Sequence, residues 1–325
     1  MKKILFIATG GTIASQEGTD GLIPVLTSKD LLYQVPELQS ICSLDAIELF
    51  RLDSTNITPA EWLKLEQTIE ARYDSYDGFV IAHGTDTMAY TAAALSYLIQ
   101  NSAKPIVLTG SQKPINDRDT DARSNLIRAF QYAVSENAWG VHIVFYDRVI
   151  CGTRAVKTYS KSFHAFASMN YPDTARFREN QLAAFLPKPE LPAVRFYHAL
   201  DTRVFVLKLI PGLQPDVLHA VLPQCRGLVL EGFGLGGLPD ALLSELNAWT
   251  QNGGIVVFAT QVRNEGTDLS VYEVGRLAGK LTGTVEAKDM TTEAAVTKLM
   301  WALSAGGSQK EICKLFEQPV AFDRL

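Results

Sequence analysis

Short runs of apolar residues, each ending at small or hydroxyl-bearing residues, recur along the first half of the chain. Four of these runs are predicted as strands: Ile4–Ala8, Phe79–Ala82, Ile106–Leu108 and Val141–Phe145. Between them the apolar residues follow a helical spacing, which predicts helices over about 58–72, 87–99 and 121–134. The first of these opens with Thr58-Pro59-Ala60-Glu61, a capping box with proline at the first helical position. The predicted strands are continuously apolar, without alternation of apolar and polar residues, and helices separate them. This pattern indicates a parallel sheet that is buried on both faces.

A proline-rich stretch at Pro187, Pro189 and Pro192 interrupts this alternation. Beyond it, strands are predicted at Val204–Leu209, Gly227–Leu230, Ile255–Ala259 and Leu281–Val285, and helices at Pro239–Gln251, Thr291–Ser304 and after Ser308. We therefore predict an α/β protein with a larger N-terminal domain over 1–185, whose mainly parallel sheet is flanked by helices. A linker over 186–203 then leads to a smaller C-terminal parallel α/β domain over 204–325.

Composition and charge narrow the class of partner. The 325 residues are enough for two domains, since one domain takes ~100–200 residues. The chain has 30 Lys and Arg against 35 Asp and Glu, a net charge of −5, without a basic cluster. Nucleic acids and anionic membrane surfaces both attract basic faces. We predict a small-molecule substrate, with neither nucleic acid nor membrane as a partner.

Two further features indicate a cytoplasmic protein. The apolar run Ile4–Ala8 is shorter than the ~7–15 residues of a signal-peptide core. The four cysteines occur singly, without a C-x-x-C pair, at Cys42, Cys151, Cys225 and Cys313. Isolated cysteines are typical of reduced thiols rather than of disulfides or zinc sites. We therefore expect a cytoplasmic location and no metal site.

Candidate chemistry gathers where predicted strands end. Thr9–Ser15 reads TGGTIAS, and its glycines either form a tight turn or let a substrate approach the backbone beside the Thr12 hydroxyl. A threonine hydroxyl becomes a nucleophile when another group takes its proton. The corresponding turn after Phe79–Ala82 carries Thr85 and Asp86, which either cap a helix or offer a hydroxyl and a carboxylate. Ligands of parallel sheets bind beyond such strand ends.

Three other segments allow more than one interpretation. Lys157 is ordinarily a solvated surface charge, but beside a buried hydroxyl it could act as a base, whereas Asp86 would keep it charged. Asp53-Ser54-Thr55-Asn56 is either turn chemistry or a site for a carboxylate. His83, a single histidine at a strand end, is interpreted as structural.

Gly232-Phe233-Gly234-Leu235-Gly236-Gly237 satisfies the dinucleotide-binding pattern G-x-G-x-x-G. The pattern should open the first strand-helix unit and be followed by an acidic residue at the end of the next strand. Here that strand ends in Phe258-Ala259-Thr260-Gln261. This disfavours a nucleotide-dependent oxidoreductase, and we expect no organic cofactor.

Taken together, TGGTIAS at Thr9–Ser15 and AHGTDTM at Ala82–Met88 resemble the two signature segments of the asparaginase/glutaminase family. The resemblance continues nearly to the C-terminus, through DSTN at 53–56, TGSQ at 109–112, GTRAVK at 152–157, FHAFASMNYP at 163–172 and TKLMWAL at 297–303. These segments resemble those of the bacterial type I branch of the family, whose members are cytoplasmic. The resemblance implies hydrolysis of L-asparagine to L-aspartate and ammonia, without a cofactor, by a homodimer or homotetramer.

The resemblance also implies roles for particular residues. Thr12 matches the nucleophile that forms an acyl-enzyme, and Thr85, Lys157 and Asp86 match a second triad that relays protons. The implied substrate contacts are Asp53, Ser54, Thr55, Thr85 and Asp86, with Asp86 on the α-amino group and Ser54 on the α-carboxylate.

The sequence departs from the family pattern at two positions. Leu22 stands where many members carry a tyrosine that assists the nucleophile, and Glu231 stands where a basic residue would bind an effector. Three alternatives therefore stay open. They are a glutaminase-leaning enzyme, a catalytically impaired asparagine sensor, and an amidotransferase component acting on glutamate-charged tRNA, which would need a nucleic-acid-binding region.

Overall fold

A computed structural model describes residues 1–18, 21–179 and 181–325, and the side chain of Leu22 lies outside the described set. The chain divides into two compact units, Met1–His198 and Ala199–Leu325. The division falls inside the stretch 186–203. Part of that stretch belongs to the first unit, because β14 (Arg195–Phe196) pairs with β6 (Ile99–Gln100).

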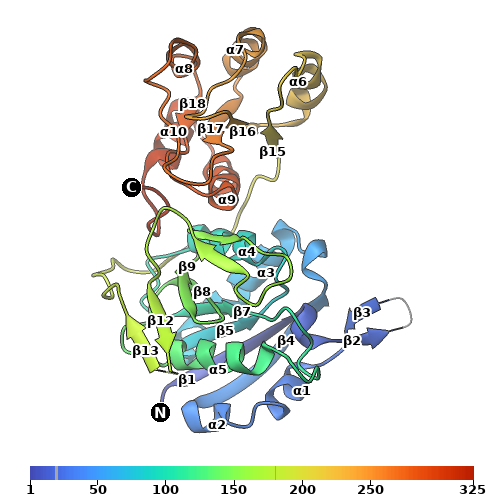
Figure 1. The fold of residues 1–325 in the computed structure, drawn as a ribbon. Helices are drawn as coiled ribbons and strands as arrows, with labels where there is room; N and C mark the ends of the chain where they lie inside the picture. Colours follow the sequence, from blue (N-terminus) through green and yellow to red (C-terminus); the bar gives the residue numbers. More distant parts are fainter. Residues whose placement is uncertain (19–20, 180) are drawn as a thin grey trace. The chain divides into compact units, whose positions relative to one another are not determined.

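An eight-stranded sheet forms the centre of the first unit, in the order β13-β12-β9-β8-β7-β5-β1-β4 (Figure 1). The strands are β1 (Lys3–Gly10), β4 (Ser43–Leu52), β5 (Gly78–Ala82), β7 (Ile106–Thr109), β8 (Val141–Phe145), β9 (Arg148–Cys151), β12 (Ala175–Arg178) and β13 (Gln181–Ala184). The run β8-β7-β5-β1-β4 is parallel, while β9, β12 and β13 extend it antiparallel. The predicted mainly parallel sheet is confirmed.

Helices cover both faces of this sheet (Figure 1). They are α1 (Ser28–Tyr33), α2 (Leu38–Ile41), α3 (Pro59–Glu70), α4 (Met88–Leu98) and α5 (Ala122–Ala133). On one face Phe6 of β1 packs against Phe130 of α5. The other face carries α3 and α4, joined by a hydrogen bond from Trp62 Nε1 to Thr91 Oγ1 at 2.9 Å. Burial on both faces explains the uninterrupted apolar run of β1.

The predicted helices of this unit form within a residue or two of their expected ends. The capping box at the start of α3 is present, and Thr58 Oγ1 donates to Glu61 Oε2 at 2.6 Å. Two hairpins that sequence patterns did not predict are β2 (Ser15–Gly18) with β3 (Gly21–Pro24), and β10 (Ala155–Lys157) with β11 (Phe166–Ser168). Among the described residues, no helix has the length and apolar character needed to cross a membrane.

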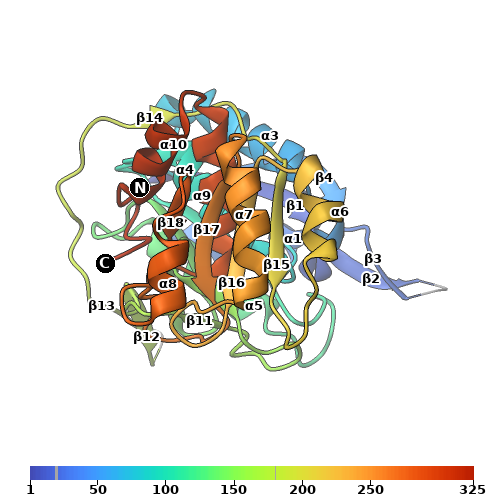
Figure 2. The ribbon, with the colours of Figure 1, turned by 90° about the horizontal axis from the view of Figure 1, so that it is seen from above.

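The second unit has a four-stranded parallel sheet in the order β15-β16-β17-β18 (Figure 2). Its strands are β15 (Val204–Lys208), β16 (Gly227–Gly232), β17 (Ile255–Thr260) and β18 (Thr284–Glu286). Its helices are α6 (Asp216–Val221), α7 (Leu243–Gln251), α8 (Glu273–Ala278), α9 (Thr292–Ser304) and α10 (Gln309–Glu317). The predicted second parallel α/β sheet is confirmed, although its last strand begins later than the expected Leu281.

The glycine-rich segment after β16 is a closed turn. Phe233 N donates to Gly237 O at 2.8 Å, and Gly237 N donates back to Phe233 O at 2.7 Å. Gly236 N also donates to Phe233 O, at 2.9 Å. A phosphate-binding turn needs free backbone N–H groups at the start of a helix. Here the N–H groups of Phe233, Gly236 and Gly237 donate inside the turn, so these glycines serve its tight backbone.

Candidate active site

The turns that follow β1, β4, β5 and β7 lie at the same edge of the large sheet. Ala8 is in register with Ala82, Ala82 with Thr109, and Gly10 with Leu52. The two neighbours of β1 are β4 on one side and β5 on the other, so the strand order reverses direction at β1. Such a reversal opens a crevice beyond the carboxyl ends of the strands, where ligands of α/β sheets bind.

Glycines let three of these turns touch. Gly11 has φ +77°, and a Cβ atom on it would lie 2.3 Å from Gly84 N. A Cβ atom on Gly84 would lie 2.6 Å from Ser54 Oγ. The backbone next to Thr12 therefore contacts the backbone next to Thr85, and Ser54 lies against the turn that carries Thr85.

We expect Gly11→Ala to destabilise the first unit strongly. The new methyl group would meet the Gly84 backbone, in addition to the strain of a positive φ. Gly140→Ala is the matched control, because Gly140 has φ +54° and open space around its Cβ position. Urea unfolding should give Gly11→Ala a loss larger by about 1–3 kcal/mol, the usual cost of overpacking. Equal losses for the two variants would contradict the close approach of the turns.

Thr12 begins a short 3-10 turn, Thr12–Ala14, directly after Gly11. Three hydrogen bonds hold Gly11: its N–H donates to Leu52 O at 2.9 Å, and its carbonyl accepts from Ala14 N at 3.1 Å and from Ser15 Oγ at 3.0 Å. Thr12 itself is half-buried. Its backbone is therefore fixed, while its side chain keeps access to solvent or to a ligand.

Lys157 joins Thr85 and Asp86, although it lies far from them along the chain. Its Nζ donates to Thr85 Oγ1 at 2.8 Å and to Asp86 Oδ1 at 2.6 Å. The side chain of Lys157 is 18% exposed and that of Asp86 is 56% exposed, whereas Thr85 is buried. The ammonium group is thus shielded next to the hydroxyl, and the carboxylate stays open to a ligand.

Gln112 completes this cluster, although it was not among the predicted site residues. Thr85 Oγ1 accepts from Lys157, so its own proton is free to be donated to Gln112 Oε1, at 3.3 Å. Gln112 Nε2 donates to Ser162 O at 3.1 Å, which orients the amide. The signal that could have found it is its place in TGSQ, directly after β7 at the same sheet edge.

Asp121 holds the turn that carries Gln112. Its two carboxylate oxygens each accept from Gln112 N at 3.0 Å, and Asn125 Nδ2 donates to Gly110 O at 2.9 Å. Burial raises the pKa of Asp121, while the hydrogen bonds that it accepts from the N–H groups of Gln112 and Lys113 partly offset the rise. The turn is therefore anchored to the start of α5.

Ser54 is the most closely tied of the three polar residues after β4. It is 2% exposed, its Oγ accepts from Asp86 N at 3.2 Å, and its carbonyl accepts from Thr87 Oγ1 at 2.7 Å. Asp53 and Thr55 are exposed and bonded to each other, since Asp53 Oδ1 accepts from Thr55 N and Oγ1, both at 2.9 Å. The structure brings Ser54 next to Asp86, and it uses Asp53 to close the turn.

His83 holds the turn that carries Thr85 and Asp86 through two hydrogen bonds. It is fully buried, with Nδ1 2.7 Å from Gly84 O and Nε2 2.9 Å from Thr91 Oγ1. Burial lowers the pKa of His83 to about 4, so the ring is neutral at pH 7. A neutral ring that donates to Gly84 and accepts from Thr91 fixes the turn and has no free nitrogen for acid–base work.

Glu231 lies near the end of β16, in the second unit, where its carboxylate accepts from Thr292 Oγ1 at 2.5 Å. The neighbouring Glu293 is half-buried, and the loss of solvent around its carboxyl group raises its pKa to about 7, while the charge of Glu231 adds to the rise. Two adjacent carboxyl groups favour a cationic neighbour over an anionic effector group.

Both units resemble known proteins. Two family models match the chain, "Asparaginase, N-terminal" over residues 3–189 and "Glutaminase/Asparaginase C-terminal domain" over residues 203–316. The chain is 40% identical over 323 residues to L-asparaginase from Thermococcus kodakarensis, covering 98% of both chains. It is 35% identical over 332 residues to L-asparaginase 1 from Escherichia coli K12, covering 98% of this chain and 96% of that protein.

A solved structure and a more distant relative also match the chain, and the more distant relative is named as an amidotransferase component. The solved structure of the thermostable L-asparaginase from Thermococcus kodakarensis matches with a TM-score of 0.91 at 39% identity, covering 99% of this chain and 98% of the other. The chain is also 32% identical over 330 residues to one component of the glutamyl-tRNA(Gln) amidotransferase from Pyrococcus abyssi. That match covers 97% of this chain and 75% of the amidotransferase component.

Proposed function

Because the chain belongs to the asparaginase family, we propose that it hydrolyses L-asparagine to L-aspartate and ammonia through an acyl-enzyme on Thr12. The observation that carries this proposal is the ammonium group of Lys157, which donates to both Thr85 Oγ1 and Asp86 Oδ1. Thr85 and Asp86 sit on the turn that contacts the Thr12 turn through Gly11 and Gly84. Relatives named L-asparaginase over nearly the whole chain support the same substrate.

In the first step, the Thr12 hydroxyl oxygen attacks the side-chain amide carbon of asparagine. The new C–O bond forms as the C–N bond breaks, and the hydroxyl proton ends on the leaving nitrogen, which departs as ammonia. In the second step a water oxygen bonds to the same carbon as the C–O bond to Thr12 breaks, a proton of the water restores the Thr12 hydroxyl, and aspartate leaves. Each step needs a positioned group that accepts and returns a proton.

Thr85 and Lys157 supply this relay. The ammonium of Lys157 lies 2.8 Å from Thr85 Oγ1 and stabilises negative charge that develops there as a proton leaves. The Thr85 proton, which faces Gln112 Oε1, can turn toward an entering water or the leaving nitrogen. Asp86 balances the charge of Lys157 at 2.6 Å, so the shielded ammonium is not left unpaired.

Substrate orientation follows from the groups around Thr85. The half-exposed Asp86 carboxylate has a second oxygen available for the substrate α-ammonium group. Ser54 lies beside Asp86 and offers its hydroxyl to the α-carboxylate, with Asp53 and Thr55 next to it. Holding both charged ends of the amino acid places the side-chain amide over Thr12 and supplies the proximity part of the rate enhancement.

We expect asparagine to be preferred over glutamine by about 10- to 200-fold in kcat/KM, the range that one methylene group supplies in a fitted pocket. Steady-state ammonia release from both amides measures the preference. A preference for glutamine would favour the glutaminase-leaning alternative. Binding of asparagine without ammonia release would favour the impaired sensor instead.

We further propose a homo-oligomeric protein of the cytoplasm, a dimer or a tetramer. The amidotransferase alternative is disfavoured by charge, because the chain carries a net charge of −5 without a basic cluster for tRNA. Light scattering during size-exclusion chromatography measures the oligomer, and a monomeric mass would contradict this proposal. Retention of charged tRNA on the purified protein would favour the amidotransferase alternative.

A further inference from the structure

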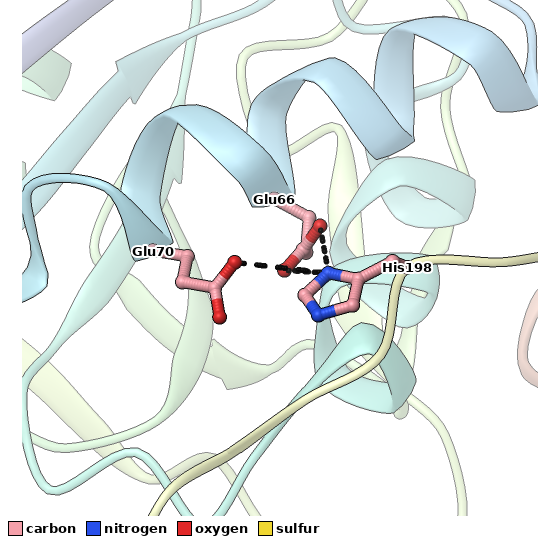
Figure 3. A group of neighbouring side chains, drawn as sticks. All are labelled: Glu66, Glu70 and His198. Atoms are coloured by element: carbon pink, nitrogen blue, oxygen red, sulfur yellow. Dashed lines mark hydrogen bonds and ion pairs between the residues drawn. The ribbon is translucent and has the colours of Figure 1, made fainter.

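Three side chains that take no part in the proposed reaction gather beside α3 (Figure 3). Glu66 and Glu70 lie one turn apart on this helix, and His198 is the last residue of the first unit. One nitrogen of His198 and one oxygen of each glutamate all lie within 4.8 Å of one another. Residues four apart on a helix share a face, so both carboxylates point toward the same imidazole.

The spacing of these atoms is wider than that of ion-pair hydrogen bonds. His198 Nδ1 lies 3.2 Å from Glu66 Oε1, 3.3 Å from Glu66 Oε2 and 3.7 Å from Glu70 Oε2. A charge-assisted N–H···O contact is usually about 2.7–2.9 Å. A tetrahedral ion with ligands at about 2.0–2.1 Å keeps neighbouring ligand atoms about 3.3–3.4 Å apart. The observed distances from the imidazole nitrogen to the carboxylate oxygens are close to this ligand-to-ligand spacing.

Glu66 adds an independent sign of a missing partner. Its side chain is 0% exposed, and its Oε1 atom has no hydrogen-bond partner, although it faces His198 at 3.2 Å. A buried carboxylate oxygen is costly unless it is bonded or neutralised. The Glu66 carboxylate faces the His198 imidazole from one side and Glu70 faces it from another (Figure 3).

We propose that Glu66, Glu70 and His198 bind one divalent transition-metal ion, for which zinc is the best representative. One imidazole and two carboxylates suit zinc, whereas magnesium prefers an all-oxygen octahedron with several waters. Glu70 and His198 are half-exposed, which leaves an entry path and room for a water as a fourth ligand. The ion would tie the end of the first unit to α3 and stabilise the fold without entering the reaction.

The test titrates zinc chloride into the chelator-treated full-length protein by calorimetry, with thermal unfolding in parallel. The wild type should bind one zinc ion per chain, and saturating zinc should raise its Tm by about 5 °C. Glu70→Gln and His198→Gln should each weaken zinc binding by at least about 10-fold, since the loss of an outer-shell partner already costs 10- to 100-fold. Glu70 and His198 are chosen because both are partly exposed and tolerate substitution better than the buried Glu66.

His219→Gln is the matched control, because His219 pairs with Glu245 elsewhere on the surface. This variant should bind zinc as the wild type does. As a second control, magnesium ions should neither bind the wild-type protein at this site nor raise its Tm. Far-UV circular dichroism verifies that each variant is folded. Unchanged zinc affinity in both Glu70→Gln and His198→Gln would overturn the site, and so would equal effects of magnesium and zinc.

Discussion

Thr12→Val is expected to lower kcat for ammonia release from L-asparagine by about 10⁴-fold or more, the scale at which removal of a nucleophile acts in hydrolases. Valine keeps the shape of threonine and removes the hydroxyl, so no acyl-enzyme can form. The half-buried position after Gly11 makes a packing defect small. The KM for asparagine should change little, because Thr12 is not one of the charged contacts that hold the amino acid.

Two comparisons make the Thr12 result specific. Thr12→Ser keeps a hydroxyl and should retain part of the activity, whereas Thr12→Val should not. Urea unfolding should place both variants within about 0.5 kcal/mol of the wild type, as is usual away from tightly packed positions. If Thr12→Val kept a tenth or more of the wild-type kcat, Thr12 would not be the nucleophile.

The second large effect is expected from Lys157→Met, which should lower kcat by about 10³-fold, within the range of proton-transfer groups. Methionine keeps much of the side-chain length and removes the ammonium that donates to Thr85 Oγ1 and Asp86 Oδ1. Negative charge that develops at Thr85 is then no longer stabilised. The Asp86 carboxylate also loses its partner, so the KM for asparagine should change together with kcat.

Lys161→Met is the matched control for Lys157, because Lys161 lies four positions further along the chain and is exposed. Its removal takes away the same charge from the same part of the chain and should leave kcat within about twofold, since an exposed charge contributes little. Equal losses in the two variants would show that net charge, and not the contact with Thr85, sets the rate.

The central strands were predictable because the sheet is buried on both faces. Ile4–Ala8 and Phe79–Ala82 are continuous apolar runs, and both are buried throughout in the fold. The capping box at Thr58 marked the start of α3 for an equally local reason. By contrast, β4 carries Asp45 and Glu48 among its apolar residues, and its positions are exposed or half-buried, with none fully buried. Its pattern lacks the uninterrupted apolar run used to predict the other strands.

Sequence motifs suggested which residues form the candidate site, but they did not predict the contacts between these residues. The contact between Lys157 and Thr85 spans 72 positions and depends on the short hairpin β10–β11, which no periodicity reveals. Family resemblance grouped these residues without saying how they bond. Gln112 had no role before its contact with Thr85 was seen. His198 and Glu66 are 132 positions apart, and no local pattern connects them.

A crystal structure of Thr12→Val with bound L-asparagine tests most directly whether Thr12 attacks an amide held by the neighbouring turns. We predict that the amide carbon lies about 3–3.5 Å from the side-chain atom that replaces the Thr12 hydroxyl, the distance of a near-attack arrangement. The α-ammonium group should contact Asp86, and the α-carboxylate should contact Ser54. An asparagine bound with its amide carbon beyond reach of residue 12, and against Thr85 instead, would contradict the proposed nucleophile.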